Sequence, residues 1–149
     1  MMTTAGTDNE GVLRGTRGLV VEDELFIALD IEAALQEAGA DVVGPFSELS
    51  DAVAAAGNET LSFAILDIRL ARVTTQPVCD LLTERGIPFL FYSGQPLPES
   101  MTAHYGRVSF IDKPARMADL VHAAKLLLPV SGERSDKAEK SDKARRATS

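Results

Sequence analysis

The chain of 149 residues contains a single cysteine, Cys79, and lacks any long apolar run. One cysteine excludes an internal disulfide and a cysteine metal cluster. Its neighbours Val78, Leu81 and Leu82 predict a buried structural thiol rather than a reactive one. No apolar run approaches the roughly 20 residues that a membrane-spanning helix needs. The N-terminal segment 1–16 also lacks the basic start and apolar centre of a signal peptide, so we expect a cytoplasmic protein without membrane contact.

Basic residues are in deficit, with 15 Lys and Arg against 22 Asp and Glu and a formal net charge of −7. Because phosphate backbones are bound by basic patches, this balance argues against nucleic acid as a partner. The two histidines, His104 and His122, have no ligand-like spacing, and we assign a role to neither. Metal or catalytic chemistry based on histidine is therefore not indicated.

The composition, 45% hydrophobic and 25% charged, is that of one globular domain. Segment 1–16 is polar and glycine-rich without an apolar period, which predicts a flexible leader. Segment 131–149 repeats Ser-Asp-Lys-Ala at 135–138 and 141–144 without a large apolar residue, which predicts a disordered charged tail. The folded domain is expected over 17–130.

Strand and helix patterns alternate along this domain. Apolar runs predict strands at 19–22, 40–44, 63–66, 87–92 and 108–111, and amphipathic stretches predict helices at about 24–38, 49–58, 77–86 and 115–128. Pro45 is expected to end the second strand, Ser47 to cap the next helix, and 69–76 to be a loop. The weak stretch 95–106 has room only for a short helix at 99–104. The alternation predicts a flavodoxin-like α/β three-layer sandwich, with a five-stranded parallel sheet of order 2-1-3-4-5 and helices on both faces.

Reactive polar residues follow four of the five predicted strands: Glu22 and Asp23, then Asp67, Ser93 and Lys113. The carboxyl ends of parallel strands meet at one edge of the sheet, so these side chains should converge. Carboxylates form a hard oxygen site for Mg²⁺. Asp67 can accept a phosphoryl group as an acyl phosphate, while a Lys ammonium and a Ser hydroxyl contact the phosphoryl oxygens. The joint pattern therefore predicts a site for phosphoryl transfer.

In these motifs the chain resembles the receiver domain of two-component response regulators. The matching stretches are Val21-Glu22-Asp23-Glu24, Ile65-Leu66-Asp67, Tyr92-Ser93-Gly94 and Asp112-Lys113-Pro114, and the resemblance covers about residues 17–128. The stretch Phe89-Leu90-Phe91-Tyr92-Ser93-Gly94 resembles more narrowly the Phe-Ala-Thr-Gly subgroup, often single-domain regulators of alphaproteobacteria.

The resemblance implies a role for each residue of the constellation. Asp67 would be the phosphoacceptor, Ser93 the switch hydroxyl and Lys113 the phosphate-binding base. Magnesium would be held by Glu22, Asp23, Asp67 and the backbone carbonyl of Arg69. The Lys113–Pro114 bond would be cis, and Glu24 would belong to the first turn of the following helix.

The resemblance also implies partners for a single-domain response regulator that is not a free-standing enzyme. A sensor histidine kinase or phosphotransfer protein would donate the phosphoryl group, and a downstream partner protein would read the switched surface. The chain itself would be a monomer or a weak homodimer.

Three residues depart from the family pattern and support an alternative. Glu22 stands where Asp is more common, Arg69 lies beside the path of attacking water, and Phe110 lacks the hydroxyl of the usual switch Tyr. The alternative is a phosphorylation-independent interaction module on the same fold. A metal-dependent hydrolase with Asp67 as nucleophile is disfavoured, because Arg69 occupies the position where such enzymes carry a second acid.

Each signal also has an ordinary structural explanation. Glu22 and Asp23 could be acids at a helix N-terminus, Ser93 with Gly94 could be a turn, and Lys113 could be solvated. An Asp after four apolar residues is harder to explain in this way, because an unpaired buried carboxylate is costly. The combination of all four positions at strand ends favours a receiver site.

Overall fold

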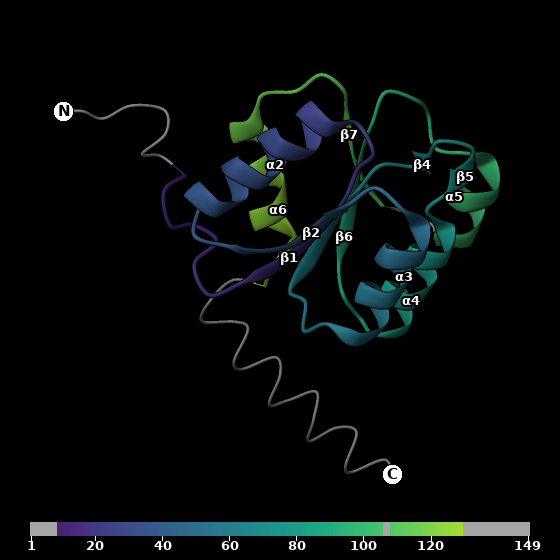
Figure 1. Cartoon of the computed structure of the whole chain (residues 1–149), viewed down its shortest axis with the longest axis horizontal. Helices are drawn as coiled ribbons and strands as arrows, with labels where there is room; N and C mark the ends of the chain where they lie inside the picture. The colour runs from purple at the N-terminus through teal and green to yellow at the C-terminus, as the bar shows by residue number, and fades with distance from the viewer. Residues whose placement is uncertain (1–8, 106–107, 130–149) are drawn as a thin grey trace, which may run out of the picture.

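The computed structural model describes residues 9–105 and 108–129. Five parallel strands form its central sheet in the order β2-β1-β3-β6-β7 (Figure 1). They are β1 (Arg17–Val21), β2 (Asp41–Phe46), β3 (Phe63–Leu66), β6 (Phe89–Ser93) and β7 (Ser109–Asp112). The predicted order 2-1-3-4-5 is confirmed once the two short strands β4 and β5, which lie outside this sheet, are set aside.

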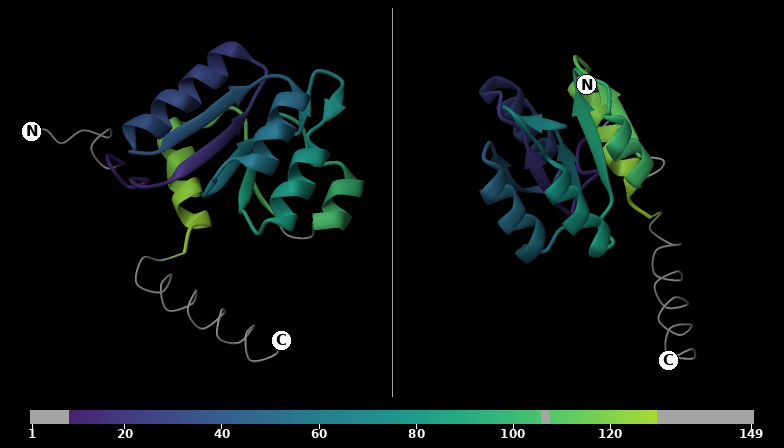
Figure 2. Two further views of the ribbon diagram at one scale, coloured as in Figure 1. Left: turned by 60° about the horizontal axis from the view of Figure 1, so that its bottom comes forward. Right: turned by 90° about the vertical axis from the view of Figure 1, so that its right-hand side faces the viewer.

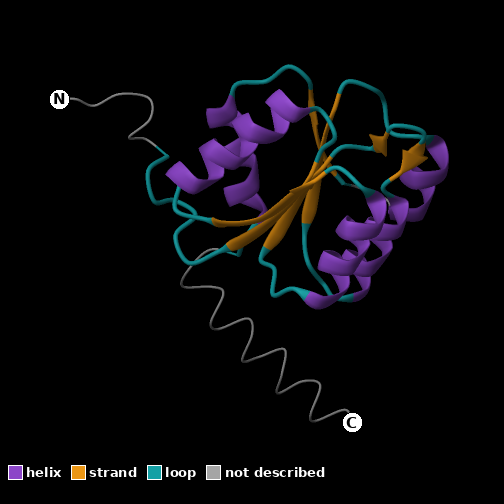
Figure 3. Ribbon diagram, in the orientation of Figure 1, coloured by secondary structure: helices purple, strands orange, loops and turns teal. Residues whose placement is uncertain are grey.

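Helices cover both faces of the sheet, as Figures 1 and 3 show. On one side lie α2 (Leu25–Glu37) and α6 (Met117–Leu127), and on the other lie α3 (Leu49–Asn58), α4 (Gln76–Glu84) and α5 (Glu99–Tyr105). In the left view of Figure 2 the two helix layers again lie on opposite sides of the strands. The predicted flavodoxin-like sandwich is therefore the observed architecture.

Each face of the sheet has its own apolar core, because successive side chains of a strand point to opposite faces. All four residues of β3 are buried. Phe63 and Ile65 join the core shared with α2 and α6, whereas Ala64 and Leu66 join the core shared with α3 and α4. A central strand enclosed on both sides in this way reads as a continuous apolar run, which explains why it was recognisable in the sequence.

A short antiparallel hairpin interrupts the path from β3 to α4. It consists of β4 (Arg69–Leu70) and β5 (Val73–Thr74), with Ala71 at a positive φ of 55° in its turn. The prediction of a loop over 69–76 is therefore wrong in this part. Ala71-Arg72 is not a standard turn pair, because neither residue favours the left-handed region, so no hairpin was predicted here.

The region around Pro45 also differs from the prediction. Strand β2 continues through Pro45 to Phe46, and its register against β1 shifts between Leu19 and Val21. An edge strand with an irregular register tolerates a proline, which cannot donate a ladder hydrogen bond. The N-cap of α3 is Glu48, without a side-chain cap bond, so Ser47 does not cap this helix.

Residues 9–16, the described part of the predicted flexible leader, are folded. Leu13 is fully buried, and its N–H donates to the carbonyl of Ala38 at 2.8 Å. The Thr16 hydroxyl is also buried and donates to the Leu13 carbonyl at 2.6 Å. The leader prediction is wrong for these residues, because one leucine in a polar segment gives no periodic signal. Residues 1–8 and the predicted tail 131–149 lie outside the described residues.

Other boundaries shift by one or two residues, and the short helix expected at 99–104 is present as α5. Both Gly44–Pro45 and Lys113–Pro114 are cis, the second as the resemblance implied. Cys79 is fully buried, as its neighbours predicted. Among the described residues, no helix has the length and apolarity to cross a membrane.

Candidate functional site

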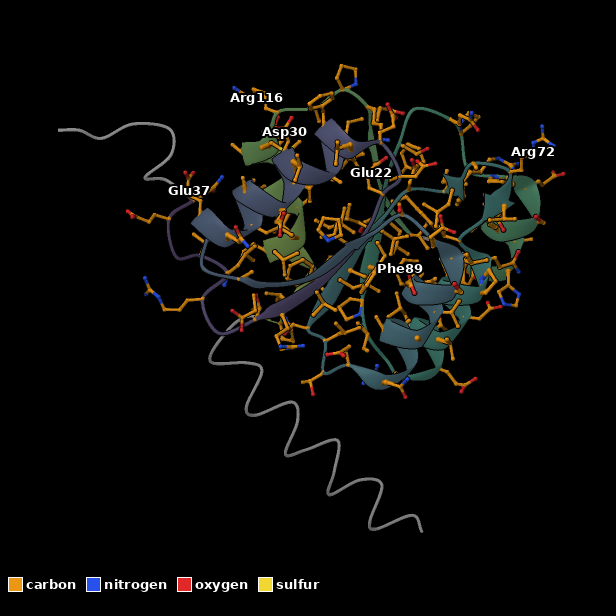
Figure 4. All side chains as sticks on the ribbon, viewed as in Figure 1. Glu22, Asp30, Glu37, Arg72, Phe89 and Arg116 are labelled. Carbon is orange, nitrogen blue, oxygen red and sulfur yellow. The ribbon has the colours of Figure 1, made fainter. Side chains whose placement is uncertain are left out.

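The predicted site residues meet at the carboxyl end of the sheet, because parallel pairing brings the strand ends level. Val21 pairs with Leu66, and Ser93 pairs with Asp112. The ladder then extends one step further, since the Asp67 N–H donates to the Val21 carbonyl at 2.9 Å. Figure 4 shows Glu22 at this end of the sheet, far along the strands from Phe89. The topology alone thus gathers residues that are widely separated in the chain.

Three carboxylates form a compact cluster at this edge. One oxygen each from Glu22, Asp23 and Asp67 lie within 4.8 Å of one another. The Glu22 side chain is almost completely buried, Asp67 is largely buried and Asp23 is exposed. Such proximity of acids is repulsive unless a cation compensates it.

Backbone amides orient each carboxylate. The Glu22 carboxylate accepts the N–H of Glu24 at 3.1 Å, and Asp67 accepts the N–H of Ile68 at 2.8 Å. Asp23 accepts the N–H of Ala71 from the hairpin turn at 2.9 Å. These bonds fix the carboxylates without supplying a positive charge.

Lys113 supplies positive charge to the cluster. Its Nζ lies 2.9 Å from Glu22 Oε1, 3.1 Å from Asp67 Oδ2 and 3.5 Å from Glu24 Oε2. It also lies 5.6 Å from the ring centroid of Tyr92, within reach of a cation–π interaction. Glu24, predicted to belong to the first turn of the helix, is the N-cap of α2 and also contacts the site lysine.

The pKa values of two of these groups, Glu22 and Lys113, are both raised. Burial raises the pKa of the Glu22 carboxyl, although its bonds to Lys113 and Glu24 oppose the shift. Burial acts to lower the pKa of Lys113, but hydrogen bonds and charge attraction to Glu22 and Asp67 outweigh it, so this pKa is raised. Lys113 is thus a firmly protonated cation, whereas Glu22 carries its charge at a cost.

Ser93, the last residue of β6, is 3% exposed, and its Oγ accepts the N–H of Gln95 at 3.3 Å. It lines an open pocket of about 450 Å³ together with Asp67, Lys113, Arg69 and Asp23. The pocket is large enough for a phosphoryl group, and its lining places an acceptor carboxylate, an ammonium and a hydroxyl around one space.

The three residues that depart from the family pattern occupy different places. Glu22 is at the centre of the cluster, and Arg69 is exposed at the start of β4, where it lines the pocket. Phe110 lies in β7, partly buried against the core under α3 and α4, away from the pocket lining.

Two residues at the site, Thr75 and Ala71, were not predicted from the sequence. Thr75 is fully buried, and its hydroxyl donates to the Asp67 carbonyl at 2.7 Å. Ala71 contributes through its backbone, which no side-chain pattern can reveal. The position of Thr75 just before a Pro-initiated helix does suggest an N-cap, but not the direction of its hydroxyl.

The donor set fits Mg²⁺, which prefers carboxylate and carbonyl oxygens over nitrogen or sulfur. Glu22, Asp23 and Asp67 supply clustered carboxylate oxygens. One oxygen of Glu22 is engaged by Lys113 and the other by the Glu24 amide. Asp23 and Asp67 are therefore the more available ligands in this arrangement.

No protein-family model and no curated protein sequence matches the chain. Solved structures do resemble it. PhyR from Brucella abortus aligns with a TM-score of 0.68 and 24% identity over 87% of this chain and 54% of PhyR, so the chain spans about half of that regulator. A CheY-like receiver domain protein from Methanospirillum hungatei aligns with a TM-score of 0.67 and 23% identity over 85% of this chain and 98% of its own length.

A third similar structure is described as a magnesium complex. It is the receiver domain of the sensor histidine kinase PA1611 from Pseudomonas aeruginosa, with a magnesium ion coordinated in its active-site cleft. It aligns with a TM-score of 0.65 and 21% identity over 76% of this chain and 97% of the receiver domain. Together these likenesses show that the chain has the fold of response regulator receiver domains.

Proposed function

We propose that the chain is a response regulator receiver that accepts a phosphoryl group on Asp67. The observation that carries the proposal is the 3.1 Å contact between Lys113 Nζ and Asp67 Oδ2, made in a pocket also lined by Ser93 and next to a triple carboxylate cluster. The same pairing in a purely structural ion pair would not require a hydroxyl and an open pocket beside it.

The donor is a phosphohistidine. An Asp67 carboxylate oxygen attacks phosphorus, the bond from phosphorus to the imidazole nitrogen breaks, and the imidazole leaves with the electron pair of that bond. Lys113 stays beside the phosphoryl oxygens and compensates their charge. The Ser93 hydroxyl donates a hydrogen bond to one of them, which draws the end of β6 toward the site.

Magnesium would be held by Glu22, Asp23, Asp67 and the Arg69 carbonyl, and it would neutralise charge on the transferred group. Lys113 also has a role before transfer, because its Nζ lies between the carboxylates of Glu22 and Asp67. It is 2.9 Å from Glu22 Oε1 and 3.1 Å from Asp67 Oδ2. The acceptor is thereby kept in place while it is unmodified.

The donor would be a sensor histidine kinase or a phosphotransfer protein, and its docking surface would lie on α2. Leu25, Phe26 and Leu29 are exposed by 65%, 80% and 47%. Leu25 and Leu29 line a hollow of about 320 Å³ that also reaches Glu22 and Asp23. Exposed apolar groups next to a reaction site are typical of a protein interface.

The wider proposal keeps the expectations drawn from the sequence. The chain acts as a cytoplasmic switch rather than as a free-standing enzyme, as a monomer or weak homodimer, without binding nucleic acid or membranes. A downstream protein reads the surface of α5, β7 and α6. We also propose that the chain belongs to the Phe-Ala-Thr-Gly subgroup of alphaproteobacterial regulators, which residues 89–94 resemble.

The direct test is incubation with a small phosphodonor and Mg²⁺, followed by intact mass measurement. Wild type should gain one phosphoryl group, and Asp67→Ala should gain none. Asp23→Asn should react more slowly and need more Mg²⁺. Equal modification of wild type and Asp67→Ala would refute the assignment of Asp67.

One observation favours the alternative of a phosphorylation-independent interaction module. Both Glu22 oxygens already have partners, which closes part of the acidic site without a metal. Phe110 also lacks a switch hydroxyl. Such a module would show Mg²⁺ affinity, but its backbone NMR spectrum would not change when a phosphodonor is added. Hydrolysis of a generic phosphoester would instead indicate the disfavoured hydrolase.

A further inference from the structure

The β4–β5 hairpin follows Asp67 and Ile68. Hydrogen bonds connect both its base and its tip to the acidic site. Thr75 holds its base and Ala71 holds its tip. Arg72, in the turn of the hairpin, points outward from the molecule (Figure 4). Leu70 of β4 is buried in the apolar core, whereas the hydrogen bonds at the base and at the tip of the hairpin lead toward the carboxylates.

At the base, Thr75 closes a loop around the phosphoacceptor. Its hydroxyl lies 2.7 Å from the Asp67 carbonyl and 3.1 Å from the Ile68 carbonyl. Its own N–H donates to the Ile68 carbonyl at 2.8 Å. Since Ile68 in turn donates its N–H to the Asp67 carboxylate, the fixed backbone segment is the one that orients this carboxylate.

The direction of the Thr75 hydroxyl is unusual for its position. Thr75 is the N-cap of α4, where a threonine oxygen ordinarily accepts an N–H of the first helical turn. It makes no such cap bond here. The fully buried hydroxyl is instead committed to the strand end that carries Asp67. The helix therefore begins without a side-chain cap, and the Thr75 hydroxyl holds the backbone carbonyl of Asp67 instead.

At the tip, Ala71 adopts a φ of 55° and donates its N–H to Asp23 Oδ2 at 2.9 Å. A non-glycine residue is disfavoured in this left-handed region by about 1–2 kcal/mol. The hairpin base must hold the turn in place for this amide to reach the carboxylate. Asp23 is thus oriented from the tip of the hairpin, and Asp67 from the Ile68 amide at its base.

We propose that Thr75 is a positioning residue for the acidic site. By fixing the Asp67–Ile68 backbone and the base of the hairpin, its hydroxyl sets the geometry of Asp67 and, through Ala71, that of Asp23. The affinity of these carboxylates for Mg²⁺ should therefore depend on this hydroxyl. The inference rests on the proposed function in that it takes Mg²⁺ as the cation of the site.

Calorimetric titration of the full chain with Mg²⁺ alone tests the proposal. Thr75→Val removes the hydroxyl at nearly constant shape, and we expect the dissociation constant to rise about tenfold, as for other groups that orient metal ligands. Thr75→Ser keeps the hydroxyl and should keep the wild-type affinity. Thr74→Val is the matched control, because the Thr74 hydroxyl accepts only the Gln76 N–H at 3.4 Å and does not contact Asp67.

A second measurement separates positioning from general stability. Amide hydrogen exchange without Mg²⁺ should be faster at Ala71 in Thr75→Val than in Thr75→Ser, since the tip loses its support. A merely structural role would lower the melting temperature but leave Mg²⁺ affinity unchanged where the protein is folded. If Val at this buried site prevents folding, Thr75→Ala against Thr75→Ser gives the same comparison, because the pair differs by one oxygen.

Unchanged Mg²⁺ affinity in the folded variant without the hydroxyl would overturn the proposal and leave the proposed function intact. A wild type that binds no Mg²⁺ would overturn both. Phosphorylation of Asp67 together with an altered affinity of Thr75→Val and a normal affinity of Thr75→Ser would support both.

Discussion

Lys113, whose side chain is 12% exposed, is the cation that compensates the charge of the acidic site. It is paired with the almost fully buried Glu22 and with Asp67, and removing one partner of a buried pair leaves an uncompensated charge. Burial of Glu22 raises its pKa, and the hydrogen bond from Lys113 opposes this shift by stabilising the charged carboxylate.

Replacing Lys113 with Met should therefore lower the free energy of unfolding by about 3 kcal/mol or more at neutral pH without Mg²⁺. Urea unfolding measures the loss. Lys125→Met, at an exposed position of α6, is the control and should change stability little. Glu22→Gln combined with Lys113→Met should recover part of the loss. Similar stability of Lys113→Met and Lys125→Met would contradict the role assigned to Lys113.

Cys79 offers a test of burial through pH. Burial raises its thiol pKa to about 12, against an ordinary value of 9.0. Because the folded state holds the proton more tightly, the thiol's contribution is complete below pH 9 and is lost as pH rises toward 12. Between pH 9 and 10, the unfolding free energy of wild type should fall relative to Cys79→Ala by up to about 1.4 kcal/mol per pH unit.

Denaturant unfolding across this range checks the expected slope. Tyr105 would add its own effect at higher pH, because burial also raises its pKa above the ordinary 10.0. Since Tyr105 is present in both proteins, the difference between wild type and Cys79→Ala reports the thiol. A wild-type slope equal to that of Cys79→Ala would show that the thiolate is accommodated in the folded state.

The sequence predicted which side chains meet in the site, but not how they are held. Glu22, Asp67, Ser93 and Lys113 each follow an apolar strand, so the topology fixed their common edge. The contact of Glu24 with Lys113 and the support from Ala71 were not predictable, because both depend on loop geometry. Their roles in phosphoryl transfer stay predictions.

At the scale of elements, α2 combines a buried stripe with an exposed apolar end. Ala28, Ile31 and Leu35 are buried, whereas Phe26 is 80% exposed next to Leu25, which lines the hollow that reaches Glu22 and Asp23. Such an arrangement is stable without a partner only because the rest of the helix anchors it. The exposed end is therefore available for docking.

Phe26→Asp should reduce phosphotransfer from a protein donor by about tenfold, since interface anchors of this kind contribute at least ~1–2 kcal/mol. Phosphorylation by a small phosphodonor should stay unchanged, because the acceptor is untouched. Leu126→Asp, which alters a side chain 70% exposed on α6, is the control and should affect neither reaction. An equal decrease with both donors would place the effect in the chemistry rather than in docking.

The elements themselves show where sequence patterns lose information. β3 was recognisable because it is apolar throughout, β6 because its first residues are apolar and aromatic, and α6 because its buried residues recur with a helical period. β4 and β5 have two residues each and no period. β2 passes through Pro45, which ordinarily signals an end, and only tertiary pairing with β1 reveals the continuation.

The whole molecule is built on two apolar cores that meet across one sheet. Both cores include residues of β1, β3 and β6, so the central strands tie the two helix layers together. The alternation of strands and helices was enough to predict this layering. The burial of Leu13 was not predictable, since it depends on where the start of the chain passes the end of α2.

Charge also acts at this scale, because a chain with a net charge of −7 is stabilised to some degree by any cation. Specific Mg²⁺ binding must exceed this general effect. A cation that binds only the folded state should add about 2.7 kcal/mol to the unfolding free energy at a concentration of 100 times its dissociation constant.

Urea unfolding with Mg²⁺, compared with Na⁺ at equal ionic strength, should therefore reveal an increment specific to Mg²⁺ in wild type. Asp23→Asn removes one charge from the cluster and leaves the buried Glu22 in place, so it should lose most of this increment. Asp51→Asn, at an exposed acid in the first turn of α3, removes the same charge elsewhere and should retain it. Equal increments in both variants would show that Mg²⁺ acts on the net charge of the molecule and not at the carboxylate cluster.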